Sequence, residues 1–421
     1  MEKSIFTVAI LGVGARGGDT YGRVLKNFPK QFKIVSLCDL RPERLAIFGE
    51  EFGVAESERF TDENVFFTKK RADLLIIATQ DADHVRHCLK AFELGYDVLM
   101  EKPITDKLED CQTVLDAQKK YGCKSLVCHV LRYAPAFLKV AELLDSGAIG
   151  RLVAINALER VAHWHQAHSY VRGNWRNREQ STPMILAKCC HDLDLLQYYA
   201  KSKCESISSV GDLTYFNKKN APEDSADRCV NCKHVETCQY SAKRIYLDRW
   251  DKHGKPVDNW PYNVIACAPT TKEKLTEAIK NGPYGRCVFA CDNNVVDHQL
   301  TQMTFENGVK ASLTMTAFTD EGGRRMHFFG TNGEIIFDEA EDTIVLKRFG
   351  GEQTTLEIKA ISDNGYGHGG GDFCLINTLY DMLRGVAESC TSLEASIESH
   401  LMGIYAEESR LNGGKTIKIH A

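Results

Sequence analysis

The sequence lacks the features that mark several classes of protein. No apolar run approaches the roughly 20 residues that cross a bilayer, so we expect no membrane contact. The net charge of −5 leaves no basic field, so we expect no nucleic-acid partner. The opening Met-Glu-Lys-Ser has no apolar signal segment behind it, which favours a cytoplasmic protein. Low-complexity segments and fixed-period repeats are also absent.

The length and composition are those of a globular protein with more than one core. A chain of 421 residues exceeds one ordinary core, so two domains are expected. The apolar fraction of 43% is typical of such proteins. The 16 cysteines are many, and inside a cell we expect them to be reduced thiols or metal ligands.

A glycine-rich turn follows the first predicted strand. The apolar residues 5–11 predict a buried parallel strand that runs into Gly12-x-Gly14-x-x-Gly17. Gly12 allows the tight turn, Gly14 allows close approach to a pyrophosphate, and Gly17 lets the next helix pack on the strand. The pattern predicts a nicotinamide dinucleotide site, the alternative being a glycine turn in another doubly wound fold.

An acidic residue ends the second predicted strand, residues 32–38. Asp39 lies about 20 residues after the last glycine, where a carboxylate can bond both ribose hydroxyls of the adenosine. Its charge would repel a 2′-phosphate, so we expect NAD. Arg41 and Arg44 lie nearby and keep NADP as the alternative.

Strands and helices alternate through residues 1–128. This alternation predicts a doubly wound parallel sheet, with ligands beyond the carboxyl ends of its strands. Further strands are predicted at 72–79, 96–100 and 124–127, and helices at 84–94 and 108–121. The fourth strand delivers Glu101-Lys102-Pro103 to the cofactor side. There Lys102 could bond a substrate hydroxyl and stabilise the alkoxide that forms as hydride leaves. The alternative is a surface lysine in a loop.

The motifs together resemble one family. GVGARG at 12–17, Asp39, His84 after the third strand and MEKP at 100–103 resemble the glucose–fructose oxidoreductase, inositol dehydrogenase and MocA family. The resemblance implies that Lys102 is catalytic and that His84 lies near the cofactor, a structural histidine being the alternative. The predicted cofactor-binding residues are Gly12, Gly14, Arg16, Gly17, Asp39, Arg41, Thr79, His84, Glu101 and Lys102.

The resemblance also describes residues 129–421. It implies an α+β domain that has a large, open, mostly antiparallel sheet, with helices on one face and another subunit on the other. We therefore expect a homodimer or homotetramer. Asn307-Gly308 predicts a hairpin between strands 300–306 and 310–319, and Asn332-Gly333 predicts another. Residues 372–383 and 392–411 are predicted helices, with Asp372 as an N-cap.

A histidine on a predicted helix is the second catalytic candidate. Helical spacing puts His191 and Asp194 one turn apart on one face. The resemblance implies that His191 is the acid/base partner near the substrate, a core histidine being the alternative. Inositol dehydrogenase-like members carry an aspartate where this chain has Ala187, with Lys188 beside it. The departure weakens inositol as a substrate, and the cation favours an anionic ligand.

Residues 160–176 mix aromatic, histidine and arginine side chains. Such a loop suits a sugar, and Arg172 and Arg176 could clamp an anionic group. Two alternatives are a metal held by the loop histidines, of which only 163 and 165 share a face in an extended segment, and a polar loop between subunits. The predicted substrate-binding residues are Arg132, Tyr133, His163, His165, His168, Arg172, Trp175, Arg176, Lys188, Asp194 and His368.

A cysteine-rich insertion spans about residues 217–291. Cys229-x2-Cys232-x5-Cys238 could hold structural zinc with a fourth thiolate from Cys287, or from Cys291 or Cys267. Zinc would staple an insertion that has few core positions. Unligated thiols and an iron–sulfur cluster are the alternatives.

These observations lead to three hypotheses about function. The first is an NAD-dependent dehydrogenase of a sugar or polyol, in which Lys102 and His191 handle the proton. The second is a redox-neutral glycosidase that oxidises a glycoside transiently, eliminates the aglycone, adds water and reduces again. The histidine-rich loop motivates this second hypothesis. The third is a non-catalytic, NAD-sensing regulator.

Overall fold

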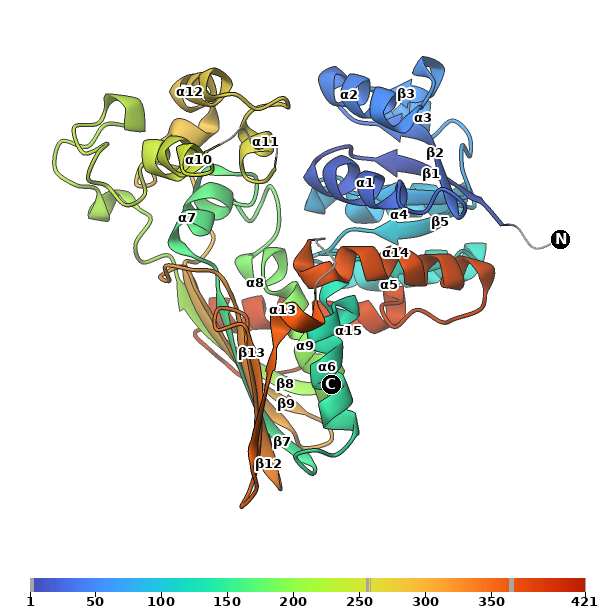
Figure 1. Ribbon diagram of the computed structural model, residues 1–421, viewed down its shortest axis with the longest axis vertical. Helices are drawn as coiled ribbons and strands as arrows, with labels where there is room; N and C mark the ends of the chain where they lie inside the picture. Colours follow the sequence, from blue (N-terminus) through green and yellow to red (C-terminus); the bar gives the residue numbers. More distant parts are fainter. Residues whose placement is uncertain (1–3, 255–256, 258, 363–366, 421) are drawn as a thin grey trace.

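The computed structural model describes residues 4–254, 257, 259–362 and 367–420, and each structural statement below concerns those residues. Two β-sheets organise the chain, one in each half (Figure 1). None of the described helices has the length and apolar composition needed to cross a bilayer.

The first sheet has six parallel strands in the order β3-β2-β1-β4-β5-β6. Its strands are β1 (Phe6–Leu11), β2 (Phe32–Cys38), β3 (Arg59–Phe60), β4 (Leu74–Ile77), β5 (Asp97–Met100) and β6 (Ser125–Val127). This is the strand order of a dinucleotide-binding Rossmann fold, so the predicted fold of the N-terminal half is confirmed. The order reverses between β1 and β4, which places a ligand crevice at their carboxyl ends.

Helices cover both faces of this sheet, and two of them come from the far end of the chain. The N-terminal helices are α1 (Arg23–Leu25), α2 (Pro42–Phe52), α3 (Glu63–Phe66), α4 (His84–Glu93) and α5 (Leu108–Tyr121). Helix α14 (Gly371–Arg384) buries Leu375 and Leu379 in the same core as Ile10. Helix α15 (Leu393–Leu411) buries Leu393 in the core on the other face (Figure 1).

The second sheet has nine strands in the order β14-β13-β12-β11-β7-β10-β9-β8-β15. Its strands are β7 (Leu152–Arg160), β8 (Cys204–Asp212), β9 (His298–Phe305), β10 (Lys310–Thr316), β11 (Gly323–Gly330), β12 (Gly333–Asp338), β13 (Thr343–Arg348), β14 (Gln353–Glu357) and β15 (Ile417–Lys418). Only the β7–β10 pair is parallel among these strands. The predicted mostly antiparallel sheet and both predicted hairpins are confirmed.

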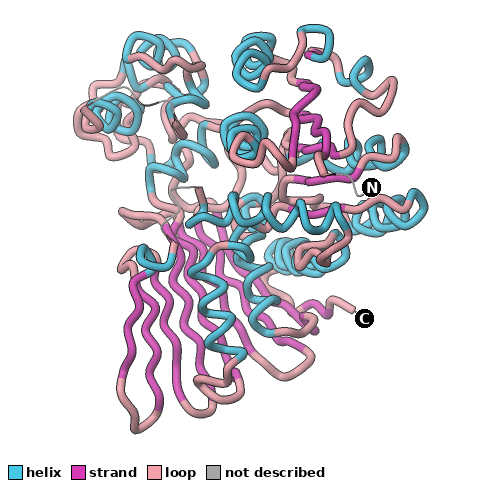
Figure 2. The backbone as a smooth tube through the Cα atoms, turned by 45° about the vertical axis from the view of Figure 1, so that its right-hand side comes forward, coloured by secondary structure: helices cyan, strands magenta, loops and turns pink. Residues whose placement is uncertain are grey.

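One face of the second sheet is covered by helices, and Figures 1 and 2 show the opposite face without a helix on it. The covering helices are α6 (Pro135–Asp145), α9 (Cys190–Ala200), α13 (Ile358–Ile361) and α15. A shallow groove on the open face is lined by polar side chains, among them Asn156, Gln302 and Lys310.

The cysteine-rich insertion lies between β8 and β9 and forms a separate lobe (Figure 1). Its helices are α10 (Arg249–Asp251), α11 (Tyr262–Ile265) and α12 (Lys272–Asn281). Phe216, Tyr246 and Phe289 form a core of its own with Val171. The lobe also reaches the Rossmann domain, because the buried Asn263 accepts a hydrogen bond from Arg44 at its carbonyl (3.1 Å) and donates one to Asp19 (3.0 Å).

Candidate active site

The glycine-rich turn leaves no room for a side chain at two of its three glycines. Gly12 has φ +86°, and a Cβ there would stand 2.4 Å from the Ala78 carbonyl oxygen. A Cβ on Gly17 would stand 2.0 Å from the Gly12 carbonyl oxygen. A Cβ on Gly14 would meet only the Arg41 guanidinium, at 3.7 Å. Gly12 and Gly17 thus hold the turn closed, while Gly14 leaves backbone exposed where a pyrophosphate would approach.

Asp39 fixes the turn from the neighbouring strand. One carboxylate oxygen accepts the Val13 N–H at 2.7 Å, and the other accepts the Arg41 N–H at 2.9 Å. The Arg41 side chain is about half exposed and lies 3.4 Å from the same carboxylate. The turn, the carboxylate and the following helical residues Ala15–Gly22 therefore fit the dinucleotide that the sequence predicts.

Arg16 and Glu101, both predicted to contact the cofactor, contact each other. Arg16 Nε donates to Glu101 at 2.6 Å, and a second guanidinium nitrogen donates to Asp372 at 2.7 Å. Tyr21 also donates to Glu101, at 2.7 Å. These bonds join the glycine turn, the end of β5 and the start of α14, so the two residues shape the crevice.

His84 and Thr79 connect the loops after β4 and β5. One ring nitrogen of His84 lies 2.7 Å from the Pro103 carbonyl oxygen, and the other lies 3.2 Å from the Thr79 carbonyl oxygen. The Thr79 hydroxyl lies 3.0 Å from His87. Both ring nitrogens of His84 are thus engaged within the protein, and the ring is buried. This geometry supports the structural alternative for His84.

Lys102 and His191 come together where the two domains meet. Lys102 Nζ donates to the Ala187 carbonyl at 3.1 Å, the last residue of α8 (Met184–Ala187), four residues before His191. His191 is 6% exposed, and its Nδ1 is buried without a hydrogen-bond partner among the described residues. Burial, and after it the charge of Lys102, lowers the pKa of His191 well below its usual range. The imidazole is therefore neutral near pH 7.

A third acid/base group stands beside His191. The His368 ring lies 6.0 Å from the His191 ring, and its Nδ1 is 2.9 Å from an Asp372 carboxylate oxygen. Burial opposes ionisation of Asp372, but Arg16 and His368 hold its pKa below the usual range. The predicted N-cap role of Asp372 is wrong: Gly370 is the N-cap of α14, and Asp372 lies in the first turn.

Arg132 and Asp194 face each other rather than a ligand. Two guanidinium nitrogens of Arg132 donate to the Asp194 carboxylate at 2.6 and 2.7 Å, and both side chains are buried. The Tyr133 hydroxyl lies 2.7 Å from the Thr391 hydroxyl, also buried. The substrate contacts predicted for these three residues therefore lack support in the geometry.

Lys188 belongs to a four-charge cluster that the sequence analysis missed. Its ammonium lies 2.9 Å from buried Glu159, whose other oxygen lies 3.1 Å from Arg324. Arg324 also bonds Asp192 at 2.9 Å. Glu339 is a fifth charged group, 3.9 Å from Arg324, and burial raises the pKa of Asp192 to about 7. The only sequence signal was two ionisable neighbours, Lys188 and Asp192, within the helical segment of His191.

The histidine-rich segment is helical, so the assumed extended geometry is wrong. It consists of α7 (His163–His165) and a π-helix, Gln166–Arg172. The His165 ring packs 4.8 Å from Trp260, and burial, then the charges of Lys188, His168 and Lys102, lower its pKa well below the usual range. His165 therefore lies close to the catalytic candidates.

The other histidines of this segment bond protein groups. His163 Nδ1 lies 3.4 Å from the Thr319 carbonyl oxygen. His168 lies 3.0 Å from the Tyr246 hydroxyl, and burial lowers its pKa to about 3. Among the described residues, no three His, Cys, Asp or Glu side chains are arranged to hold a metal ion.

The predicted anion clamp is not formed. Buried Arg172 donates to the carbonyls of Arg286 and Tyr240, each at 2.7 Å, inside the insertion. Arg176 pairs with Asp292 at 2.8 Å. Trp175 donates to Asp81 of the Rossmann domain at 3.0 Å and so joins the two halves. The hydrogen bonds recorded for both guanidinium groups are therefore made to protein groups.

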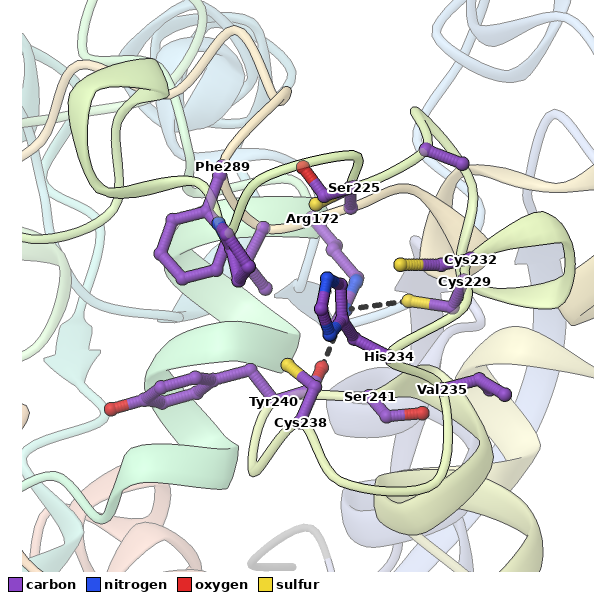
Figure 3. Close-up of a pocket in the computed structure, with 14 residues that line it drawn as sticks. Arg172, Ser225, Cys229, Cys232, His234, Val235, Cys238, Tyr240, Ser241 and Phe289 are labelled. Atoms are coloured by element: carbon purple, nitrogen blue, oxygen red, sulfur yellow. Dashed lines mark hydrogen bonds between the residues drawn. The ribbon is translucent and has the colours of Figure 1, made fainter.

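The cysteines are all reduced in the structure. Cys229, Cys232, Cys238 and Cys287 line one small cavity in the insertion, whereas Cys267 and Cys291 do not border it (Figure 3). As placed, these thiols do not form a metal centre, so zinc stays a prediction.

Fold and site together define a two-domain, nicotinamide-dependent oxidoreductase. The model "Oxidoreductase family, NAD-binding Rossmann fold" matches residues 6–129, and "Oxidoreductase family, C-terminal alpha/beta domain" matches residues 141–419. The chain therefore belongs to the glucose–fructose oxidoreductase, inositol dehydrogenase and MocA family, as its motifs predict.

Individual relatives are distant. A putative oxidoreductase YteT of Bacillus subtilis (strain 168) is 24% identical over 88% of this chain and 89% of its own. A 2,7-anhydro-N-acetylneuraminate hydratase of Mediterraneibacter gnavus is 24% identical over 48% of this chain and 51% of its own. A solved levoglucosan dehydrogenase with NADH and levoglucosan has a TM-score of 0.72 at 16% identity, covering 99% of this chain and 100% of its own.

Proposed function

We propose that this NAD-binding oxidoreductase transfers hydride between a nicotinamide and a carbinol carbon of a sugar or polyol. The observation that carries the proposal is the meeting of Lys102 and His191 at the domain junction, beyond the carboxyl end of β5. The crevice between β1 and β4 opens at this same edge of the sheet.

Each group has a distinct part in the chemistry. When bound, the nicotinamide supplies the hydride acceptor. Neutral His191 can accept the hydroxyl proton of the substrate, because burial keeps it unprotonated near pH 7. The Lys102 ammonium, held by the Ala187 carbonyl, stabilises negative charge on the same oxygen. Glu101 orients the lysine backbone by accepting its N–H at 3.1 Å.

We further propose a neutral polyhydroxy substrate. The positive charges of Lys188 and Arg324 are paired with the carboxyl groups of Glu159, Asp192 and Glu339, so the cluster offers no unpaired cation to an anion. The aromatic ring of Trp260, which packs on His165 and is 37% exposed, is a surface on which a sugar face can stack. This replaces the anionic ligand favoured by the sequence alone.

A redox-neutral glycosidase or hydratase is the second candidate. It needs two acid/base groups, one for elimination and one for addition of water, and His368 beside His191 supplies the second. The similarity to a hydratase over half of each chain favours the same chemistry.

One experiment separates the two candidates. The protein is incubated with NAD and a panel of sugars, polyols and glycosides, and NADH absorbance and product masses are followed together. A dehydrogenase accumulates NADH and a ketone. Cleaved or hydrated product without NADH would contradict the first candidate and support the second. Turnover by neither route, with Lys102→Met unchanged, would leave the NAD-sensing regulator.

The catalytic assignment has a matched test. Lys102→Met should lower kcat by roughly 10²- to 10⁴-fold, the usual contribution of a positioned proton-transfer group. Lys107→Met, an exposed lysine in the following loop, is the control and should leave kcat unchanged. Equal rates for the two variants would show that Lys102 does not act in the reaction.

We also propose that the open face of the nine-stranded sheet binds a second copy of the chain in the cytoplasm. The polar groove around Asn156 and Gln302 offers side-chain hydrogen bonds to an identical face. Light scattering after size-exclusion chromatography measures the assembly. A monomer at micromolar concentration would contradict this proposal.

A further inference from the structure

The cavity in the insertion has the size of a single ion. It is bordered by Cys229, Cys232, Cys238 and Cys287, together with His234. Figure 3 shows Cys229, Cys232, Cys238 and His234 around it. Its volume is about 20 Å³, which holds one water-sized guest.

The fourth cysteine is brought in from a distant part of the chain. Arg228 and Arg286 form an antiparallel bridge, and the Cys287 N–H donates to the Asp227 carbonyl at 2.8 Å. This pairing sets Cys287 beside Cys229, at the start of the Cys-x2-Cys turn. Backbone geometry therefore selects Cys287 from the three candidates that the spacing left open.

A buried cation points to negative charge in the cavity. Arg172 lines it, is 1% exposed, and donates to the Cys229 sulfur at 3.5 Å. Its other recorded partners are two carbonyl oxygens, and one terminal nitrogen is buried without a partner among the described residues. A buried guanidinium without a carboxylate partner needs another compensating group of negative charge. A metal-bound set of cysteine sulfurs would provide it.

The backbone also donates to sulfur at this place. The Ala242 N–H points to the Cys229 sulfur at 3.4 Å, so this sulfur accepts two N–H groups. Hydrogen bonds of this kind from outside the ligand set orient the ligands of metal sites. The two N–H groups therefore hold the Cys229 sulfur in a fixed place at the edge of the cavity.

We propose that Cys229, Cys232, Cys238 and Cys287 bind one Zn²⁺ ion. Four thiols and a pocket for one ion match the closed tetrahedral site of structural zinc, with Zn–S distances near 2.3 Å. The four thiols lose four protons to solvent, and no redox step occurs. The thiols as placed do not form a metal site, so the proposal requires the four side chains to move together when the ion binds. Arg172 offsets part of the site's double negative charge.

The ion would hold a wall of the substrate site in place. The lobe it crosslinks supplies Trp260, which packs on His165, and Tyr246, which bonds His168. The same lobe reaches the Rossmann domain through Asn263. A lobe with few core positions thus gains a fixed orientation over the crevice from the metal.

Metal content of the full-length protein tests the proposal. The protein is produced in zinc-supplemented medium, purified with a reductant, and analysed by plasma mass spectrometry. We expect about one zinc per chain. Cys232→Ser/Cys238→Ser should lose at least nine-tenths of it. Cys267→Ser and His234→Ala are controls, since Cys267 lies outside the cavity and His234 already bonds the Glu223 carbonyl at 2.8 Å; both should keep it.

A second measurement avoids any dependence on folding of the variants. A mercurial is added stepwise to the wild-type protein in the presence of a zinc indicator. The indicator should report release of the ion as about four thiols react with the mercurial. Chelated protein should be cut by protease first within residues 213–291. Zinc-free wild-type protein that takes up no zinc under reducing conditions would overturn the proposal. So would iron with acid-labile sulfide in place of zinc, or full zinc in the double cysteine variant.

Discussion

Replacing Asp39 with asparagine tests how the protein selects its dinucleotide. The carboxylate accepts the Val13 and Arg41 N–H groups at 2.7 and 2.9 Å. An asparagine oxygen can still accept one of these bonds, so Asp39→Asn removes the charge and keeps much of the turn. The charge is what would repel the 2′-phosphate of NADP.

The size of the effect follows from Coulomb's law. Two unit charges about 6 Å apart at an effective dielectric constant near 20 interact by about 2.8 kcal/mol. Arg41, 3.4 Å from Asp39, compensates part of this repulsion, so we take about 1.4 to 2.8 kcal/mol. Asp39→Asn should therefore tighten NADPH binding by roughly 10- to 100-fold. Loss of charged ribose hydrogen bonds should weaken NADH by about tenfold.

Dissociation constants of NADH and NADPH, measured by energy transfer from tryptophan, check this expectation. Asp342→Asn is the matched control, because Asp342 also accepts a backbone N–H, from Lys359 at 3.0 Å, but lies in the turn before β13 of the second domain. Unchanged NADPH affinity in Asp39→Asn, or an equal change in the control, would refute the electrostatic reasoning.

Three further predictions concern the turn, the buried ion pair and acid stability. Gly17→Ala should abolish NADH binding, measured by the same fluorescence assay, because its Cβ would stand 2.0 Å from the Gly12 oxygen. Arg132→Met should cost about 3–5 kcal/mol in urea unfolding by leaving Asp194 buried and unpaired; restoration by Asp194→Asn would support this cause. Burial lowers the pKa of His129, His165, His168, His191 and His400. The pKa of these histidines in the unfolded chain is about 6.5, and at lower pH only the unfolded chain binds the protons. The free energy of unfolding is therefore at its full value above about pH 6.5 and falls toward about pH 4. Each histidine contributes a loss of up to about 1.4 kcal/mol per pH unit. Denaturant midpoints that rise on acidification would contradict this.

Local patterns were enough for the first domain. Buried strands, glycine turns and Asp39 are encoded within a few residues of one another, so the sequence predicts the sheet to within about two residues at most strand ends. No strand is predicted for β8, for the exposed edge strand β14, or for β3 and β15, which have two residues each.

Partners far apart in the chain could not be predicted from spacing. The sequence analysis predicts substrate contacts for Arg132, Asp194 and Arg176. Each instead has a partner in the protein, 62 residues away for Arg132 and Asp194, and 116 for Arg176 and Asp292. Glu159 and Arg324 were missed for the same reason. Single-sequence reasoning sees which charges need compensation and not which groups provide it.

The position of α14 has a consequence for how the chain matures. Its leucines complete the core around β1, and Asp372 bonds Arg16 across 356 positions of sequence. During synthesis the nucleotide-binding half therefore leaves the ribosome with one flank uncovered, and stays so until α14 has emerged. A fragment ending after β6 would expose that apolar flank to other chains. The nucleotide-binding domain can therefore complete its core only when α14, residues 371–384, is present.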